Sequence, residues 1–201
     1  MKHNVITVTR QFGSLGRPIA KLIAKKMNIK YYDRDIIEAT AEMLGIPVGQ
    51  FQELKEKKLT AYDKMMYPLG IGDMVMQDKI FEAEKKVILD LAAKEDCLIV
   101  GRCADYILYN SDICNTFNVF IYAPYEDRKK NCHVEFGIVP EFADDYIVKV
   151  DASRSSVYER YTGSEFMSLA YRNMLIDSSK MSKDDVADII IDAATKSFNN
   201  K

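Results

Sequence analysis

The chain has 201 residues, of which 48% are hydrophobic and 29% are charged, with a formal net charge of −2. This composition is typical of a globular protein with enough apolar residues for a core, and it argues against a general nucleic-acid binder, which is more often basic. No apolar run approaches the roughly 20 residues that a membrane helix needs, and the N-terminal run is too short for a signal peptide. We therefore expect one cytoplasmic domain over residues 1–201, without membrane or nucleic-acid partners.

The cysteines do not predict a metal site. The chain contains no C-x-x-C pair, and only two histidines could join a zinc site. We expect four reduced thiols, as in a cytosolic protein. They are Cys97, Cys103, Cys114 and Cys132.

The first predicted elements are a strand over residues 4–9 and a helix that follows it. The strand is apolar and β-branched without clean alternation, which is typical of a strand buried on both faces. Pro18 suits the first turn of a helix, and Ile19, Ile23 and Met27 recur at helical spacing behind it. Next come a strand in "IKYYD" and a helix in "RDIIEATAEML" that ends at Gly45.

The middle of the chain predicts more helices and two further strands. A charged helix is expected over residues 48–58, and an exposed, mobile segment with Pro and Gly over 60–74. Met76, Ile80, Val87 and Leu91 lie on the apolar stripe of a long helix. "CLIVG" and "FNVFIYA" are predicted to be buried strands.

The last third continues the alternation of helices and strands. "PYEDRKKNCHVEF" opens as a helix should, and residues 144–161 form a charged helical segment. "NMLIDSS" is a strand, and Ser182 with Asp185 approximates a capping box before the final helix.

This alternation predicts an α/β fold with a parallel sheet of about five strands and helices on both faces. Ligands in such sheets bind at the carboxyl ends of the strands. The segments expected there are residues 10–17, 33–35, 101–105 and 123–128, and each contains an arginine.

The turn "TRQFGSLGRPIA" has the layout of a phosphate-binding loop. Gly13 and Gly16 let the backbone curl, and the helix behind it offers unpaired N–H groups to an anion. A ligand-free turn is the alternative, but Arg10 and Arg17 both need an anionic partner. We expect donor phosphates to be bound by Gly13, Ser14, Leu15, Gly16 and Arg17.

This turn departs from the standard pattern G-x-x-x-x-G-K-[ST]. With the helical core starting at Ile19, Arg10 falls at the first glycine and Leu15 at the second. Gly16 falls at the lysine, and Arg17 at the hydroxyl residue. The loop therefore lacks the two side chains that usually hold the donor phosphate and the magnesium ion.

Two further strand ends carry charged residues. Asp33 is a candidate ligand of Mg²⁺ or of a substrate hydroxyl, with helix capping as the alternative. In "VGRCADYIL", Gly101 allows close approach and Arg102 is a candidate phosphate holder. The alternative for Arg102 is a surface salt bridge to Asp105.

Charged residues in "APYEDRKKN" and "KVDASRSSVYERY" are usually solvated, but they can also form a lid whose arginines close over a triphosphate. Gly137 and Pro140 lie between the two runs and suit hinges.

Together these motifs resemble the cytidylate kinase-like family of nucleoside monophosphate kinases. The resemblance covers nearly all of the chain and rests on "TVTRQFGSLGRPIAKLIA", "YYDRDII", "VGRCADYIL", "VFIYAP", "VDASRSSVYERYTG" and "NMLIDSS". It implies a P-loop NTPase core with an NMP-binding region at about residues 33–95 and a lid at about 128–163. Gly101 and Arg102 match the start of the family's "GRD" motif, whereas Cys103 replaces its aspartate. Asp151 and Arg154 resemble the Asp and Arg of the family's lid.

The resemblance implies transfer of the γ-phosphoryl group of ATP, with Mg²⁺, to a nucleoside monophosphate, with CMP or dCMP as the first candidates. The expected catalytic residues are Arg10, Arg17, Arg128 and Arg154. The expected acceptor-binding residues are Asp33, Arg34, Gly101, Arg102, Asp105 and Asp151. The alternatives are a nucleotide-binding sensor that does not catalyse and a kinase of another small phosphate acceptor.

Overall fold

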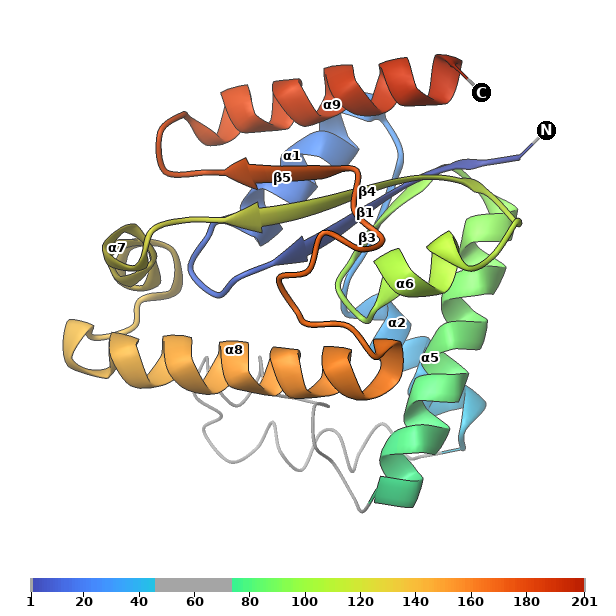
Figure 1. The fold of residues 1–201 in the computed structure, drawn as a ribbon, viewed down its shortest axis with the longest axis horizontal. Coiled ribbons are helices and arrows are strands. Elements are labelled where there is room, and N and C mark those ends of the chain that lie inside the picture. The colour runs from blue at the N-terminus through green and yellow to red at the C-terminus, as the bar shows by residue number, and fades with distance from the viewer. Residues whose placement is uncertain (1, 46–73, 201) are drawn as a thin grey trace.

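A parallel sheet of five strands runs through the middle of the protein, in the order β2-β3-β1-β4-β5 (Figure 1). The computed structural model describes residues 2–45 and 74–200. The strands are β1 (Asn4–Arg10), β2 (Lys30–Tyr32), β3 (Cys97–Val100), β4 (Asn115–Tyr122) and β5 (Met174–Asp177). The helices are α1 (Gly16–Met27), α2 (Asp35–Met43), α5 (Met74–Lys94), α6 (Ala104–Tyr109), α7 (Tyr125–Phe136), α8 (Pro140–Thr162) and α9 (Lys183–Asn199).

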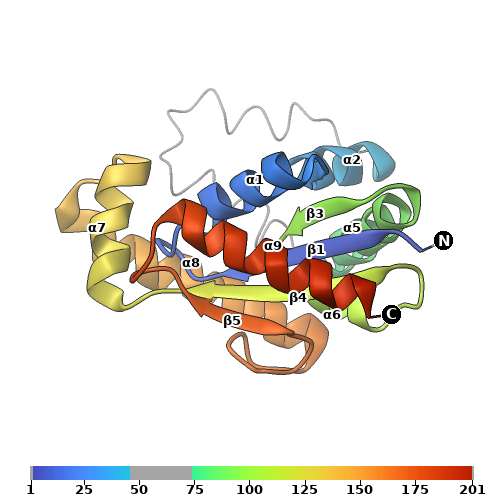
Figure 2. The same ribbon diagram turned by 90° about the horizontal axis from the view of Figure 1, so that it is seen from above.

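Helices cover both faces of the sheet and make three layers (Figures 1 and 2). On one face, Ile19 and Ile23 of α1 and Val186 of α9 pack against Ile6 and Val8 of β1. On the other face lie α5, α6 and α8, with α2 beside α5. Successive side chains of a strand point to opposite faces, so the apolar run of β1 supplies both cores.

The predicted strands and the layered α/β architecture are confirmed. The final helix is capped as predicted, because the Ser182 hydroxyl accepts a hydrogen bond from the Asp185 N–H at 3.1 Å. α8 begins earlier than the predicted residue 144, at Pro140, which occupies the first turn. Met76 was predicted on the apolar stripe of α5, yet it is 37% exposed. The helix predicted over 48–58 and most of the segment predicted over 60–74 lie outside the described residues.

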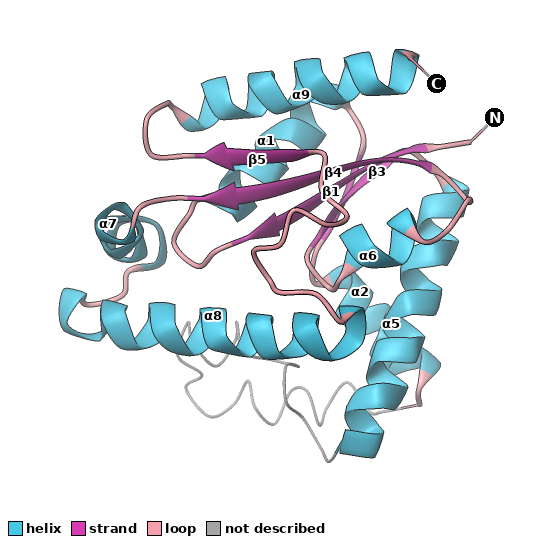
Figure 3. Cartoon of the chain, in the orientation of Figure 1, coloured by secondary structure: helices cyan, strands magenta, loops and turns pink. Residues whose placement is uncertain are grey.

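The loops after β1 and β4 lie at the carboxyl edge of the sheet, where β4 leads into α7 (Figure 3), and Gly101 after β3 lies against the Arg10 side chain. Phe12, in the loop after β1, packs with Cys132 of α7 and with Ala143, Ile147 and Val150 of α8. The two helices predicted to form a lid therefore contact the predicted phosphate loop directly.

Candidate phosphate-binding site

The turn from β1 into α1 presents backbone N–H groups that have no hydrogen-bond partner among the described residues. Gly13 and Leu15 have positive φ angles of 77° and 60°, and Leu15 is the N-cap of α1. Within residues 2–45 and 74–200, no acceptor takes a hydrogen bond from the N–H groups of 13–17. A helix N-terminus with such groups favours an anion, through both hydrogen bonding and the helix dipole.

Internal hydrogen bonds hold the shape of this turn. The Ser14 hydroxyl donates to the carbonyls of Gln11 and Ile121, both at 3.0 Å, and the Ser178 hydroxyl donates to the Ser14 carbonyl at 2.7 Å. The Ser14 hydroxyl is therefore used in hydrogen bonds within the protein. A ligand at this turn would contact Ser14 through its backbone N–H.

Helices α7 and α8 are fastened to the same turn. The Asp151 carboxylate accepts the Phe12 N–H at 2.7 Å and forms an ion pair with Arg128, which is buried. Arg128 also donates to the Phe12 carbonyl at 3.3 Å. A Cβ placed on Gly13 would lie 2.6 Å from the Arg128 carbonyl oxygen, so the loop and α7 approach more closely than any side chain at 13 would allow. Arg128 and Asp151 thus support the turn.

Arg17 and Asp33 form a forked ion pair between α1 and the end of β2. The Arg17 Nε lies 2.6 Å from the Asp33 Oδ2, and its Nη2 donates to Oδ1 at 3.3 Å. Asp33 is buried, and Tyr31 donates to it at 3.3 Å. Burial alone would raise the pKa of Asp33, but Arg10 and Arg17 outweigh it and hold this pKa below the ordinary value.

Arg10 extends from the end of β1 into this cluster. Its side chain lies over Gly16, because a Cβ there would lie 2.6 Å from the Arg10 Cβ. Its Nη1 lies against Gly101, where a Cβ would overlap it. Burial lowers the pKa of Arg10 to about 10, with Asp33 opposing and with Arg17 and Arg102 adding to the effect. Arg10 is therefore still charged at neutral pH.

Arg102 lies in a turn with three successive positive φ angles, 75° at Gly101, 59° at Arg102 and 53° at Cys103. Such backbone is costly for residues other than glycine and is concentrated at functional sites. The Arg102 Nη1 donates to Glu84 of α5 at 3.0 Å, and both side chains are largely buried. Burial raises the pKa of Glu84, although Arg102 opposes that shift.

Arg154 reaches the cluster from α8. Its Nη1 donates to the Arg10 carbonyl at 3.1 Å, and its guanidinium lies 5.9 Å from the centre of the Phe12 ring. Its nearest described carboxylate is that of Asp151, at 3.8 Å. Burial, followed by the charge of Arg10, lowers the pKa of Arg154 well below the ordinary value.

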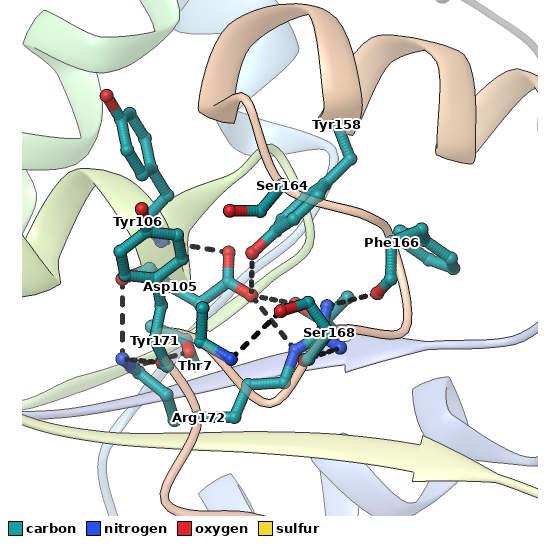
Figure 4. A network of polar contacts seen from close by, with 12 residues as sticks. Thr7, Asp105, Tyr106, Tyr158, Ser164, Phe166, Ser168, Tyr171 and Arg172 are labelled. Atoms are coloured by element: carbon teal, nitrogen blue, oxygen red, sulfur yellow. Dashed lines mark hydrogen bonds and ion pairs between the residues drawn. The ribbon is translucent and has the colours of Figure 1, made fainter.

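The structure places Asp105 in a separate, buried polar network that joins β1, α8 and the segment before β5 (Figure 4). Its Oδ2 accepts from Thr9 at 3.0 Å and from Tyr158 at 3.1 Å, and it lies 3.5 Å from Arg172. Its Oδ1 accepts the Tyr106 N–H at 2.9 Å. The alternative prediction, a salt bridge between Arg102 and Asp105, was therefore wrong, because Arg102 forms its ion pair with Glu84. Both Asp105 oxygens are engaged inside the protein.

The structure thus brings together Arg10, Arg17, Arg102 and Arg154 with Asp33. Arg34 does not join them, because it is exposed at the start of α2. The described ranges contain no group of three or more His, Cys, Asp or Glu that could hold a metal ion. Asp33 does not fit a magnesium ligand in this arrangement, because the Arg17 fork occupies its carboxylate and Arg10 adds a second positive charge.

Glu84 was missed by sequence reasoning. It stands in a charged stretch of α5 that reads as a solvated helix face, far from Arg102 in the sequence. The sequence signal that could have found it is its spacing from two apolar residues of the helix, one residue after Ala83 and three before Val87. Both of these residues are buried.

Similarity to known proteins extends over most of the chain. The pattern of the cytidylate kinase-like family matches residues 5–180. The chain belongs to the cytidylate kinase-like family. A cytidylate kinase from Sulfolobus acidocaldarius is 23% identical over 185 residues, which cover 89% of this chain and 87% of the relative.

Solved structures share the fold of this family member. A protein from Eubacterium ventriosum described as uncharacterized has a TM-score of 0.70 at 22% identity, with 96% of this chain and 99% of that one covered. Shikimate kinase from Acinetobacter baumannii, in complex with shikimate, has a TM-score of 0.53 at 12% identity, with 96% and 94% covered. The fold is therefore of the P-loop NTPase type, and family and fold together indicate a kinase. No helix within the described ranges is long and apolar enough to cross a membrane.

Proposed function

We propose that this protein transfers the γ-phosphoryl group of ATP to a nucleoside monophosphate, with CMP or dCMP as the first candidates. The observation that supports this most is that four guanidinium groups gather around Asp33, beside a turn whose N–H groups have no partner among the described residues. They come from separate elements: Arg10 ends β1, Arg17 opens α1, Arg102 follows β3 and Arg154 lies on α8.

The charges of this cluster favour a highly charged anion. Asp33 faces Arg10, Arg17 and Arg102 together. Glu84 forms an ion pair with Arg102, and Asp151 lies near Arg154. Gathering guanidinium groups away from water is unfavourable until an anion joins them, and phosphates accept their paired N–H donors well. A nucleoside triphosphate beside a nucleoside monophosphate supplies such charge.

Phosphoryl transfer depends on positioning and on charge neutralisation more than on covalent chemistry by the protein. In our proposal, the N–H groups of 13–17 with Arg10 and Arg17 hold the donor phosphates. Arg102, oriented by Glu84, holds the acceptor phosphate. Arg154 stabilises the charge on the group in transfer. Arg128 and Asp151 keep the turn in place, and Asp105 keeps the α6 region in place.

Kinases of this kind generally use ATP with Mg²⁺. Because the carboxylate of Asp33 is taken up by arginine, we assign no protein-held magnesium site among the described residues. Mg²⁺ usually keeps several of its waters and is held in part by substrate phosphates, so it can enter with the nucleotide.

The acceptor is proposed from the family and from the Sulfolobus cytidylate kinase. Residues 46–73 of the predicted NMP-binding region lie outside the described residues. A kinase of another acceptor and a sensor that binds nucleotide without turnover are the competing functions. The glycine at the lysine position, Gly16, is the observation that favours the sensor.

The experiment is a coupled assay of ADP release with MgATP and a panel of acceptors: CMP, dCMP, UMP, AMP, GMP, shikimate and none. Our proposal predicts ADP release that depends on a nucleoside monophosphate, fastest with CMP or dCMP. Release with shikimate alone would replace it with a kinase of another acceptor. No release with any acceptor, together with a thermal shift by ATP, would replace it with the sensor.

A further inference from the structure

The two departures of the phosphate loop from the standard pattern are in contact with each other. Arg10 stands where that pattern has its first glycine, and Gly16 stands where it has lysine. A Cβ on Gly16 would lie 2.6 Å from the Cβ of Arg10 and 2.9 Å from its Cγ. With this backbone, a side chain at 16 and the long side chain at 10 exclude one another. The standard pattern has the reverse arrangement, with a glycine at the position of Arg10 and a lysine at the position of Gly16.

We propose that this pair is an exchange, in which the Arg10 guanidinium crosses Gly16 and takes over the donor-phosphate contact of the P-loop lysine. The inference rests on the proposed function and assigns one role within that site. Arg10 then contacts the phosphates of ATP directly, and Gly16 is required because its missing side chain opens the path.

The position of the guanidinium agrees with this role. Beyond Gly16, the Arg10 Nη1 lies against Gly101, which begins the turn that carries Arg102. The Arg10 head group therefore lies between the N-terminus of α1 and the strand end that carries the proposed acceptor-binding arginine. In our proposal, a cation there contacts the donor phosphate nearest to the acceptor.

Arg10 fits this role better than Arg17. Asp33 holds the Arg17 side chain in a forked ion pair, with contacts at 2.6 and 3.3 Å. The Arg10 guanidinium, by contrast, makes no ion pair or hydrogen bond with any residue in the described ranges. Among the described residues it is therefore a charged group with five unused donors, and its stem lies over Gly16, in the turn whose N–H groups also lack partners there.

The test uses a small set of variants and two readouts. Arg10→Met removes the charge and keeps most of the length, and Arg10→Lys keeps the charge on a group that cannot form a fork. The double variant Arg10→Gly with Gly16→Lys restores the standard arrangement and is compared with Arg10→Gly alone. Lys25→Met, at an exposed position on α1, is the matched control. The readouts are calorimetric affinity for a non-hydrolysable ATP analogue and for adenosine, and the turnover number with CMP, with thermal melting to confirm folding.

We expect Arg10→Met to weaken binding of the ATP analogue about ten- to a hundredfold, the range for loss of a charge-assisted contact. Adenosine, which has no phosphates, should bind with unchanged affinity, and Lys25→Met should bind both like the wild type. Arg10→Lys should recover only part of the loss. The double variant should bind the analogue at least tenfold more tightly than Arg10→Gly alone.

Equal affinity of wild type and Arg10→Met for the ATP analogue would overturn the exchange, even if the wild type transfers phosphate. The same holds if Arg10→Met weakens adenosine as much as the analogue, or if adding Gly16→Lys to a folded Arg10→Gly protein fails to restore affinity. If the wild type transfers no phosphate but Arg10→Met still weakens the analogue selectively, the exchange stands and the kinase proposal fails.

Discussion

Asp33→Asn removes one negative charge from the arginine cluster while leaving the side chain nearly the same size. In the wild type the carboxylate is 2.6 Å from the Arg17 Nε, and it also lowers the electrostatic cost of Arg10. The variant leaves these guanidinium groups facing one another with a neutral amide between them. We therefore expect it to fold less stably and to depend on an added anion.

The magnitude follows from the burial of the pair. Removing one partner of a buried ion pair costs about 3–5 kcal/mol. The side chains of Arg17 and Asp33 are 24% and 11% exposed, so water recovers part of their solvation and the lower end applies, about 3 kcal/mol. In a protein of this size, each kcal/mol changes Tm by about 2–4 °C, so Tm should fall by about 6–12 °C.

The assay is thermal melting against inorganic phosphate, with ionic strength held constant by sodium chloride. Phosphate should raise the Tm of Asp33→Asn more than that of the wild type, because the anion replaces the lost charge. At a hundred times its Kd, a ligand adds about 2.7 kcal/mol, enough to restore most of the loss. Asp35→Asn, exposed in the first turn of α2, is the control and should cost no more than about 1 kcal/mol without phosphate dependence. An Asp33→Asn protein as stable as the wild type without phosphate, or indifferent to phosphate, would refute the reasoning.

The ion pair between Arg17 and Asp33 also determines the direction in which stability changes with pH. Because the folded-state pKa of Asp33 is lowered, its stabilisation is fully present above the unfolded value of about 3.9 and is lost as pH falls through the lower folded value. Between about pH 5 and pH 2, wild-type Tm should therefore fall more steeply than that of Asp33→Asn. Parallel curves would contradict this assignment.

Three further predictions concern the proposed substrates and the turn. Arg102→Ala should raise KM for the monophosphate about ten- to a hundredfold and leave KM for ATP nearly unchanged, with a smaller effect in the same direction for Glu84→Gln. Steady-state kinetics with each substrate varied in turn will show it, and equal effects on both substrates would reject the acceptor role. Arg154→Ala should lower the turnover number about a hundredfold, with little change in nucleotide affinity measured by calorimetry, because a contact made chiefly in the transition state lowers the barrier without tightening the ground state. A tenfold loss of ATP affinity without any turnover in the wild type would instead favour the sensor. Gly13→Ala should lower Tm and ATP affinity together, because its φ of 77° and the Arg128 carbonyl 2.6 Å from the new Cβ both oppose a side chain; a wild-type melting curve would show that the loop and α7 can separate freely.

The strands and most helices were predictable because they depend on patterns of neighbouring residues in the sequence. Buried β-branched runs produce the strands, and apolar spacing with caps produces the helices. The short helix α6 escaped prediction because six residues hold less than two turns of periodicity. It starts after three left-handed residues, where only Gly101 carried a signal.

The site was predictable by position and less so by pairing. That Arg10, Arg17 and Arg102 share the carboxyl edge follows from parallel topology. The partners do not follow, because ion pairs form between elements far apart in the chain. Arg102 forms an ion pair with Glu84 of α5 and none with Asp105, its near neighbour in the sequence. The Asp105 carboxylate instead accepts a hydrogen bond from Tyr158 and lies 3.5 Å from Arg172. The contact of Arg10 with Gly16 likewise depends on backbone approach, which sequence spacing alone does not specify.

The most direct test of the central claim is the affinity for adenosine and cytidine joined through five phosphates. Such a molecule would fill the donor and acceptor sites together and place its phosphates among Arg10, Arg17, Arg102 and Arg154. Calorimetry should show that it binds at least about a hundredfold more tightly than ATP, as expected for an analogue spanning both substrates of a transfer reaction. Binding no tighter than that of ATP would contradict the claim that these arginines form one site for two phosphorylated substrates.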